Sequence, residues 1–480
     1  MSVEPPITAP PRTASDAGEL ALGPASAAAP SVLRTLRPLV LRLHFYAGVL
    51  VAPFLLVAAV TGLLYAGSFQ AEKIVYAHEL TVPVGDHKLP ISQQVAAARK
   101  AHPEGTIAAV RPSPQPDATT RVLLSGVKGI PADRTLAVFV DPYTGKVRGA
   151  LEQYGSTGAL PLRTWIDELH RDLHLGDTGR LYSEFAASWL WVITGGGLVL
   201  WFGRRRARRK VRGTTGRRRS LTLHGTVGVW AAGGLFFLSA TGLTWSTYAG
   251  ANIGDLREAL GQSTPSVTAT VSSGHEGHGA MAGMDMNGKD MGSHPSARSD
   301  VGLDAVLKTA RAEGLSDPVE IVPPADSNSA YVVRQIQRSW PERQDSIAVD
   351  PATGKVTDVL RFADYPLLAK LTRWGIDAHT GTLFGLANQI VLAGLALALI
   401  LLILWGYRMW WQRGRGSAFG RPLPRGAWRQ VPVYVLMPCV AAVAVVGYYV
   451  PLLGIPLSAF LVVDLLLGRI SRRRTKHAHA

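Results

Sequence analysis

The sequence of 480 residues contains a single cysteine, Cys439, and few charged residues. One cysteine cannot form an internal disulfide, and it excludes zinc or iron–sulfur sites built from cysteine. Charged residues make up 18% of the chain against 47% hydrophobic residues, a balance unusual for a soluble domain. The sequence has no phosphate-binding glycine loop, dinucleotide fingerprint, nucleophile triad or HExxH motif in a suitable context. We therefore expect a membrane protein without its own NAD(P)H or flavin site, in which His, Met or carboxylate groups hold any metal or haem.

Long apolar runs predict an α-helical polytopic membrane protein with about six spans, each long enough to cross a hydrocarbon core of about 30 Å. The last run, 431–469, is too long for one crossing and contains Pro451 and Pro456, so we expect a hairpin of two short spans. The earlier spans are expected at 33–69, 183–203, 221–248 and 384–412.

Lysine and arginine outnumber aspartate and glutamate by 50 to 34, and the arginines gather beside the predicted spans. The basic segments are 204–220, 413–430 and 470–480. Because basic loops stay in the cytoplasm, this distribution predicts an inner-membrane protein with cytoplasmic termini and with segments 70–182 and 249–383 outside. It explains the positive charge without a nucleic-acid partner. Residues 1–32, rich in Ala, Pro and Ser, are expected to be a disordered tail.

The chain also contains an internal repeat, which can be tested by comparing separations. Both His44 and His224 precede a Thr-Gly-Leu triplet by 17 residues, and both DPxTGKV motifs precede a later histidine by 29 residues. The remaining landmarks are Thr61 and Thr241, Asp141 and Asp350, Trp165 and Trp374, His170 and His379, and Gly176 and Gly385. We therefore predict two copies of one unit, consisting of a span, an outside domain, a histidine and a span, related by an approximate two-fold axis along the membrane normal.

Each outside segment is expected to form a small α+β domain. A short amphipathic helix, Ser92 to Lys100 or Leu303 to Ala312, precedes three alternating runs that are typical of strands. The DPxTGK motifs are expected to be turns in which Gly takes a positive φ. The second copy is longer by 29 residues, which places an insertion at about 272–297.

The motifs DPYTGKV and DPATGKV at the ends of these small domains resemble PepSY domains. Their alternation with histidine-bearing spans resembles the PepSY-associated transmembrane family over roughly residues 34–412. Members of that family are described as iron-regulated membrane proteins, and some are reductases of ferric siderophores that hold haem b. The resemblance implies an inner-membrane haem protein and leaves its substrate open.

Four histidines occupy equivalent places in the repeat and are candidate haem ligands. His44 and His224 start their spans on the cytoplasmic side, whereas His170 and His379 lie just before the return spans on the outer side. A histidine in or beside a span is costly, so a ligand or proton-relay role is the first hypothesis, and interfacial capping is the alternative. Two imidazoles facing each other across a two-fold axis could bind one haem iron. The matched histidines therefore suggest one or two haem sites and an electron path across the bilayer, and the resemblance implies that the haem is haem b.

Two further features of the repeat leave alternatives open. His174 follows His170 by four residues, so both could face one way on a helix and share a metal, although His174 has Leu383 as its counterpart. Small residues recur in the first span of each copy, where they allow close helix packing or make room for a flat macrocycle. They are Gly48, Gly62, Gly228 and Gly242.

The insertion in the second copy is rich in methionine and histidine, and four of the seven methionines fall within it. Thioether and imidazole groups together suit Cu(I), and imidazole alone also suits Cu(II) or zinc. The candidate ligands are His275, His278, Met281, Met284, Met286, Met291 and His294.

Three functions remain open. The first is a haem protein that passes electrons from a quinol or a cytoplasmic reductase to a ferric siderophore or a copper species outside. The second is a non-catalytic protein that captures copper or another metal through the insertion. The third is a PepSY-type regulatory protein of the envelope, in which the histidines are structural.

Overall fold

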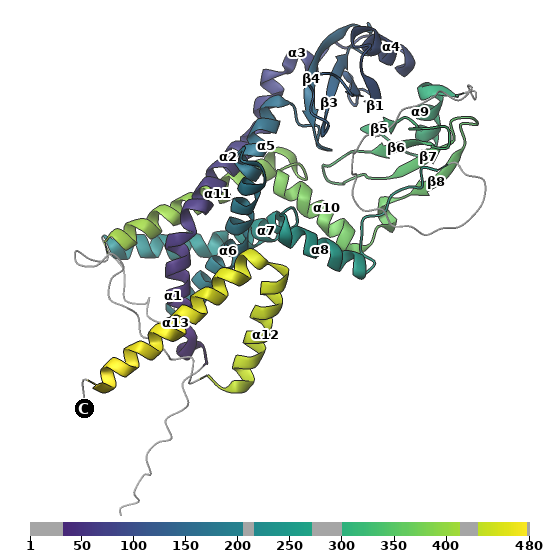
Figure 1. Cartoon of the computed structure of the whole chain (residues 1–480). Coiled ribbons are helices and arrows are strands. Elements are labelled where there is room, and N and C mark those ends of the chain that lie inside the picture. Colours follow the sequence, from purple (N-terminus) through teal and green to yellow (C-terminus); the bar gives the residue numbers. More distant parts are fainter. Residues whose placement is uncertain (1–31, 205–215, 271–299, 413–430, 478–480) are drawn as a thin grey trace, which may run out of the picture.

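The computed structural model describes residues 32–204, 216–270, 300–412 and 431–477. A single antiparallel sheet of eight strands lies at one end of its long helices. The strand order is β4-β3-β2-β1-β5-β6-β7-β8. Figure 1 shows this sheet and its covering helices above the group of long helices, and the C-terminal helices at the opposite end. The predicted tail, 1–32, and the predicted insertion, 272–297, lie almost entirely outside the described residues.

The sheet consists of two similar units, each made of one helix followed by four strands. The first unit comprises α4 (Ile91–Ala101), β1 (Thr106–Arg111), β2 (Thr120–Ser125), β3 (Arg134–Val140) and β4 (Val147–Tyr154). The second comprises α9 (Gly302–Ala312), β5 (Val319–Val322), β6 (Tyr331–Gln335), β7 (Ser346–Val349) and β8 (Val356–Leu360). The expectation of three strands per unit was wrong, because each unit contains a fourth, half-buried strand in which polar residues interrupt the apolar pattern.

The two units join edge to edge through antiparallel pairing of β1 with β5. At this seam Arg111 Nε donates to a carboxylate oxygen of Glu320 at 2.6 Å. Arg111 and Glu320 are 209 residues apart, the same separation as between Asp141 and Asp350 of the two DPxTGK motifs. Two positions that are equivalent in a repeat and also touch each other must lie at its two-fold axis. The local axis therefore runs between β1 and β5.

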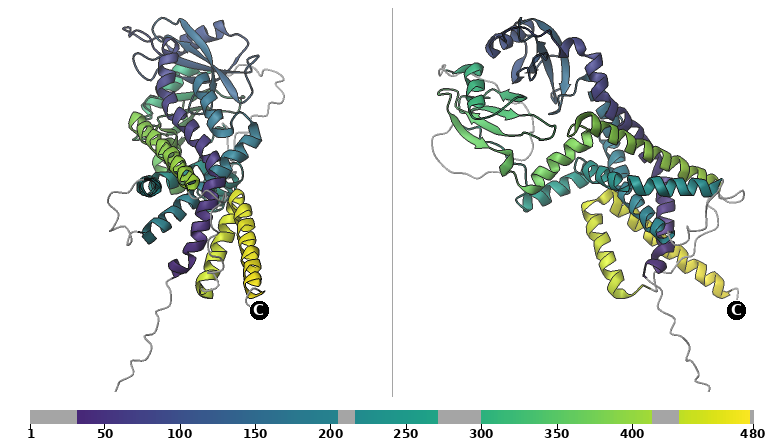
Figure 2. Two further views of the ribbon diagram at one scale, coloured as in Figure 1. Left: turned by 90° about the vertical axis from the view of Figure 1, so that its left-hand side faces the viewer. Right: turned by 180° about the vertical axis from the view of Figure 1, so that it is seen from behind.

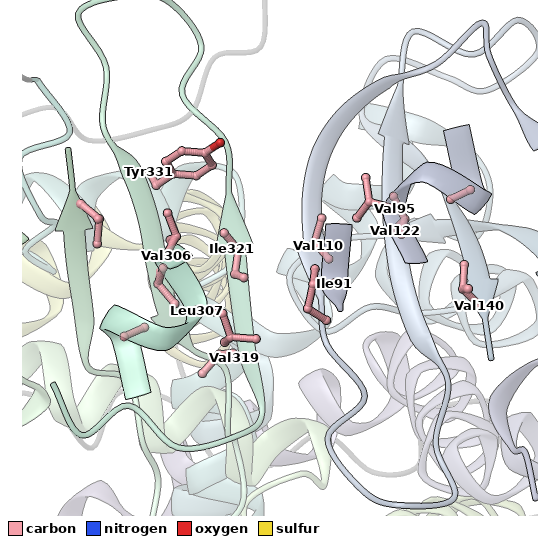
Figure 3. Packing of buried hydrophobic residues seen from close by; sticks show 14 of the residues in the cluster. Ile91, Val95, Val110, Val122, Val140, Val306, Leu307, Val319, Ile321 and Tyr331 are labelled. Carbon is pink, nitrogen blue, oxygen red and sulfur yellow. The ribbon is translucent and has the colours of Figure 1, made fainter. Parts of the chain in front are cut away.

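One face of the sheet packs under α4 and α9 around a continuous apolar core. Figure 3 shows side chains of α4 and the first strands on one side and those of α9 and the second strands on the other. Val122 and Val333, from the two units, are fully buried in this core. Such burial removes alternating strand residues from water and is worth roughly 1.5–3 kcal/mol per side chain. The strands thus form one layer despite their separation along the chain.

The DPxTGK motifs form the turns between β3 and β4 and between β7 and β8, as expected. Gly145 and Gly354 have φ of 70° and 69°, a conformation that favours glycine. Their N–H groups donate to Asp141 and Asp350 carbonyls at 2.9 and 2.8 Å. The same aspartates receive N–H groups within their turns through their side chains. The motif is therefore a structural turn.

Among the described residues, five helices are long and apolar enough to cross a membrane. They are α2 (Ala52–Val75), α6 (Gly176–Arg204), α7 (Arg217–Leu243), α11 (Gly385–Trp411) and α13 (Pro451–His477), the last with its apolar part at Pro451–Ile470. The fifth predicted span, the first half of the expected hairpin, corresponds to a shorter apolar helix, α12 (Val433–Tyr449). Figure 2 shows α7 and α11 running side by side and α12 and α13 forming a hairpin. The chain is a polytopic membrane protein.

The first predicted span is broken into two helices, α1 (Val32–Leu50) and α2, with a turn at Val51. Pro53 causes the break, because it has no N–H to donate to the carbonyl of Val49. Tyr407 of α11 donates its hydroxyl to that carbonyl at 3.0 Å. An unbroken helix over 33–69 was therefore the wrong expectation, and His44 lies on α1 rather than on the long helix α2.

The remaining helices connect the sheet with the long helices. They are α3 (Ala77–Leu80), α5 (Pro161–Asp172), α8 (Tyr248–Ala259), the 3-10 turn Phe362–Asp364 and α10 (Leu367–Thr380). Helices α5 and α10 follow the last strand of their units and lead into α6 and α11. They bring His170 and His379 from the sheet into contact with α2 and α7.

Candidate functional site

His44 and His224 meet at the end of the long helices that lies farther from the sheet. Their ring centroids are 6.3 Å apart, and their planes make an angle of 77°. Both rings line a cavity of about 720 Å³ between α1, α6, α7 and α11. We call these two residues the sheet-distal pair. The sequence predicted that they would lie together, and the structure brings them together.

A backbone hydrogen bond orients each histidine of the sheet-distal pair. His44 Nδ1 lies 2.9 Å from the carbonyl oxygen of Ile193, and His224 Nδ1 lies 3.0 Å from that of Leu402. A carbonyl only accepts, so Nδ1 must carry the proton and Nε2 is left as the basic nitrogen. Ile193 and Leu402 are 209 residues apart, so the two bonds are repeat-equivalent. Such a second contact is what commonly fixes the tautomer of a metal-binding histidine.

His170 and His379 form a second, sheet-proximal pair with a matching arrangement. His170 Nδ1 lies 2.9 Å from Thr61 Oγ1, and His379 Nδ1 lies 2.6 Å from Thr241 Oγ1. Each threonine hydroxyl donates its one proton to a carbonyl in its own helix, at 2.8 and 2.7 Å respectively. The histidines must therefore be the donors, which again leaves Nε2 basic. The two His residues also lie within electrostatic range of each other.

The threonines of the Thr-Gly-Leu triplets thus hold the sheet-proximal histidines, a role that the sequence analysis did not assign. The feature of the sequence that could have indicated this role is the equal spacing, in both copies of the repeat, between each triplet and a histidine. His224 and Thr241 both lie on the unbroken helix α7, and their separation of 17 residues corresponds to roughly 25 Å of helix. The two histidine pairs are therefore separate sites at different levels along the long helices.

The four repeated glycines divide into two kinds. A Cβ at Gly62 would lie only 3.2 Å from Cε1 of His170, so Gly62 makes room for that imidazole, whereas a Cβ at Gly242 would make an ordinary contact of 3.8 Å with Cε1 of His379. Gly48 and Gly228 line the cavity, where a Cβ would meet nothing within 4 Å or only a leucine methyl at 3.6 Å. Close helix packing does not account for the second kind. Gly48 and Gly228 keep the cavity wide next to the sheet-distal pair.

Each cavity-facing stripe of α1 and α7 contains an arginine, a leucine, a histidine and a glycine at identical spacing. The residues are Arg37, Leu41, His44 and Gly48 on α1, and Arg217, Leu221, His224 and Gly228 on α7. Arg217 belongs to the basic segment 204–220, to which only a role in topology was assigned from sequence, and Arg37 was assigned no role. Their common separation of seven residues from a histidine was the signal that could have identified them as part of the site.

A buried charged cluster supports α10 next to His379. The Asp377 carboxylate is fully buried and accepts from Arg338 Nη1 at 2.8 Å. Arg373 donates to Glu342 at 2.7 Å. Burial, together with the nearby Asp377, raises the pKa of Glu342 to about 7 despite the Arg373 contact. Arg338 also donates to Ser156 of the first unit, so this cluster ties both units to the helix that carries His379.

His174 does not share a helix face with His170, so that expectation was wrong. Helix α5 ends at Asp172, and Leu173 and His174 both have positive φ, of 55° and 56°. The His174 ring instead lies 5.0 Å from Trp165 and 3.5 Å from Glu168. Within the described ranges, no group of three or more His, Cys, Asp or Glu side chains could hold a metal ion.

The Met- and His-rich insertion lies outside the described residues. Its candidate ligands, from His275 to His294, therefore stay a prediction from sequence. The same holds for copper as their ligand.

The fold and the paired histidines define a polytopic membrane protein with two fused α+β units at one end of its long helices. The family described as the PepSY-associated TM region matches residues 41–413, and the chain belongs to this family. All four paired histidines fall within the matched region, whereas α12 and α13 follow it. A search of the curated proteins finds no match to the chain.

Proposed function

We propose that the chain is a haem-binding membrane protein in which each histidine pair holds one haem b. One observation carries this proposal. In all four histidines Nδ1 is engaged as a donor, by repeat-equivalent partners, so that Nε2 is the nitrogen available to a metal. A purely structural histidine has no need for this shared tautomer. A bare metal ion would also require more ligands than two imidazoles supply.

The chemistry and size of the sheet-distal site fit a macrocycle. Two imidazoles bound to opposite faces of one metal, each through a bond of about 2 Å, would have ring centroids roughly 6 Å apart. The observed separation of His44 and His224 is 6.3 Å. The cavity of about 720 Å³ lies within the range of about 300–1,000 Å³ that is usual for cofactor sites. Gly48 and Gly228 supply the space next to the rings.

We propose that the protein transfers electrons across the inner membrane to a ferric siderophore or a copper species outside. Haem b, when bound, supplies reversible one-electron chemistry. The chain's own residues position the imidazoles, through Ile193, Leu402, Thr61 and Thr241, and the surrounding apolar helices exclude water. The four-strand units, which we propose are PepSY domains, would face the outside, and the termini the cytoplasm. A quinol or a cytoplasmic reductase would be the electron donor.

The first test is the reduced-minus-oxidised visible spectrum of the detergent-purified full chain from haem-replete cells. We expect a low-spin haem signal. His44→Ala or His224→Ala should remove the part that comes from the sheet-distal pair. His170→Ala or His379→Ala should remove the part that comes from the sheet-proximal pair. Loss of one histidine from a pair should lower haem retention at that level at least tenfold. His87→Ala, at an exposed position between α3 and α4, is the matched control and should leave the spectrum unchanged.

Absence of haem from the wild-type protein would contradict the proposal. So would a spectrum that all four histidine variants leave unchanged. In either case a regulatory role of the two α+β units, with structural histidines, would become the better explanation.

A second function rests on the sequence of the insertion, in which four of the seven methionines lie between Met281 and Met291. We propose that this segment captures copper. The full chain should bind Cu(I) with a stoichiometry that falls when residues 275–294 are deleted. Equal Cu(I) stoichiometry in the two proteins, measured by competition with a chromogenic chelator, would contradict copper capture. The haem spectrum should be the same in both, which separates the two proposals.

A further inference from the structure

Two arginines that line the sheet-distal cavity occupy equivalent positions in the repeat. Each precedes one histidine of the sheet-distal pair by the same number of residues. Arg37 precedes His44 by seven residues, and Arg217 precedes His224 by seven. Seven residues are two helical turns, or about 10 Å, so arginine and histidine lie on the same face of their helix. All four residues line the same cavity. Arg204 and Arg218 also line this cavity, but only Arg37 and Arg217 stand seven residues before a histidine of the pair.

The two arginines lie at the mouth of the cavity, and the histidines lie deeper. Arg37 and Arg217 are exposed, whereas His44 and His224 are half-buried between the helices. Between each arginine and its histidine the cavity wall is leucine, at Leu41 or Leu221. The cavity thus changes from an apolar interior containing two imidazoles to a cationic rim.

We propose that Arg37 and Arg217 bind the two carboxylates of the macrocycle that His44 and His224 hold, so that its acidic edge faces the mouth of the cavity. This inference rests on the proposed function. A haem has an apolar body, a central metal and two carboxylates along one edge. An apolar interior, two imidazole nitrogens and the guanidinium groups of Arg37 and Arg217 at the rim would be complementary to these three features. Guanidinium groups bind carboxylates through paired, charge-assisted hydrogen bonds.

A role in membrane topology alone does not explain the placement of these arginines. Topology depends on the number of basic residues near the ends of spans and not on which helix face they occupy. Arg219 and Arg408 supply the same charge nearby, yet they line a separate, neighbouring pocket with Ser220 and Trp405. These two arginines are therefore matched controls for the loss of charge at this end of the helices.

The experiment compares iron protoporphyrin IX with its dimethyl ester, in which both carboxylates are neutral. The full chain is reconstituted in detergent with each compound, and the transfer of haem to apomyoglobin is followed. Only the part of the signal that His44→Ala removes is attributed to the sheet-distal site. We expect the wild type to release the ester at least tenfold faster than the diacid. Arg37→Gln with Arg217→Gln should abolish this difference, and Arg219→Gln with Arg408→Gln should preserve it.

Equal release of ester and diacid by the wild type, with a His44-dependent spectrum, would overturn the inference and leave the proposed function intact. Faster release from the Arg37→Gln and Arg217→Gln protein only when anionic lipid is present would assign these arginines to lipid headgroups, and would also overturn it. If no haem signal depends on His44, the proposed function of this pair fails and the inference fails with it. Bis-histidine spectra in the arginine variants would show that the site is still folded.

Discussion

Replacing Glu320 with alanine is expected to destabilise the joined sheet by about 3–5 kcal/mol. The Glu320 carboxylate is only 3% exposed and lies between two arginines. Arg111 Nε donates to it at 2.6 Å and Arg334 Nε at 2.8 Å. Removing the carboxylate leaves two guanidinium groups close together without the anion between them. Because Arg111 and Glu320 lie at the local two-fold axis, the loss should open the seam between β1 and β5 first.

Hydrogen exchange of the full chain in detergent, followed by mass spectrometry, measures this effect on peptides that contain β1 and β5. Exchange there should become at least a hundredfold faster in Glu320→Ala. Glu313→Ala is the control, because Glu313 is 42% exposed and lies 3.8 Å from Arg361. Equal protection of β1 and β5 in Glu320→Ala and wild type would show that strand pairing alone holds the seam.

The contacts of Glu320 with Arg111 and Arg334 give the seam between β1 and β5 a defined pH dependence. Burial by itself would raise the pKa of Glu320, but Arg111 and Arg334 together hold that pKa below its ordinary value. A carboxylate with a lowered folded-state pKa contributes stability above the ordinary glutamate pKa of about 4.3 and loses it as the pH falls further. Protection of the seam should therefore decline below about pH 4 in the wild type and change less in Glu320→Gln.

The sequence predicted the features that occur in both copies of the repeat. Matched separations identified His44 with His224 and His170 with His379, and the structure brings the first pair to 6.3 Å. Equal offsets in the two copies indicate equivalent positions. Equivalent residues lie close together where they are near the two-fold axis. The DPxTGK turns were predictable for a different reason, because Asp, Pro and Gly set local backbone conformation without help from tertiary contacts.

Features that depend on a single copy or on distant contacts were not predictable. The break at Val51 results from Pro53, whereas the apolar pattern that predicted the span runs through it unchanged. His174 left the expected helix because Leu173 takes a left-handed conformation that leucine rarely adopts. The union of the two units into one sheet needed β1 to pair with β5, more than 200 residues away in sequence.

The C-terminal hairpin is a further single-copy feature, and it packs directly on the helices of the sheet-distal site. Arg42 Nη2 donates to the Asp464 carboxylate of α13 at 2.8 Å, and both side chains are buried. Trp189 Nε1 donates to the Leu452 carbonyl at 3.3 Å. A buried ion pair between α1 and α13 requires its two helices to stay in contact, because separating them would leave a charge in an apolar environment. The hairpin is thus an integral part of the helical region.

Filling the sheet-distal cavity from Gly48 or Gly228 is expected to abolish cofactor binding at that level without removing a ligand. A leucine side chain at either position would project into open space, because no neighbouring atom lies closer than 3.6 Å to a Cβ placed there. It would occupy the volume next to His44 and His224 at little cost to helix packing, since leucine also favours helix more than glycine by about 1 kcal/mol. Gly48→Leu and Gly228→Leu proteins should therefore fold normally and retain at least tenfold less haem at the sheet-distal site.

Gly394→Leu is the matched control for this prediction, because a Cβ at Gly394 of α11 also meets nothing within 4 Å and Gly394 does not line the cavity. The control should keep both haem signals, and the two cavity variants should keep the sheet-proximal signal that depends on His170 and His379. Normal sheet-distal haem in Gly48→Leu and Gly228→Leu would mean that the cavity is not where the macrocycle lies. A selective loss would instead tie the spectrum to this cavity through shape, independently of the histidine substitutions that remove the ligands themselves.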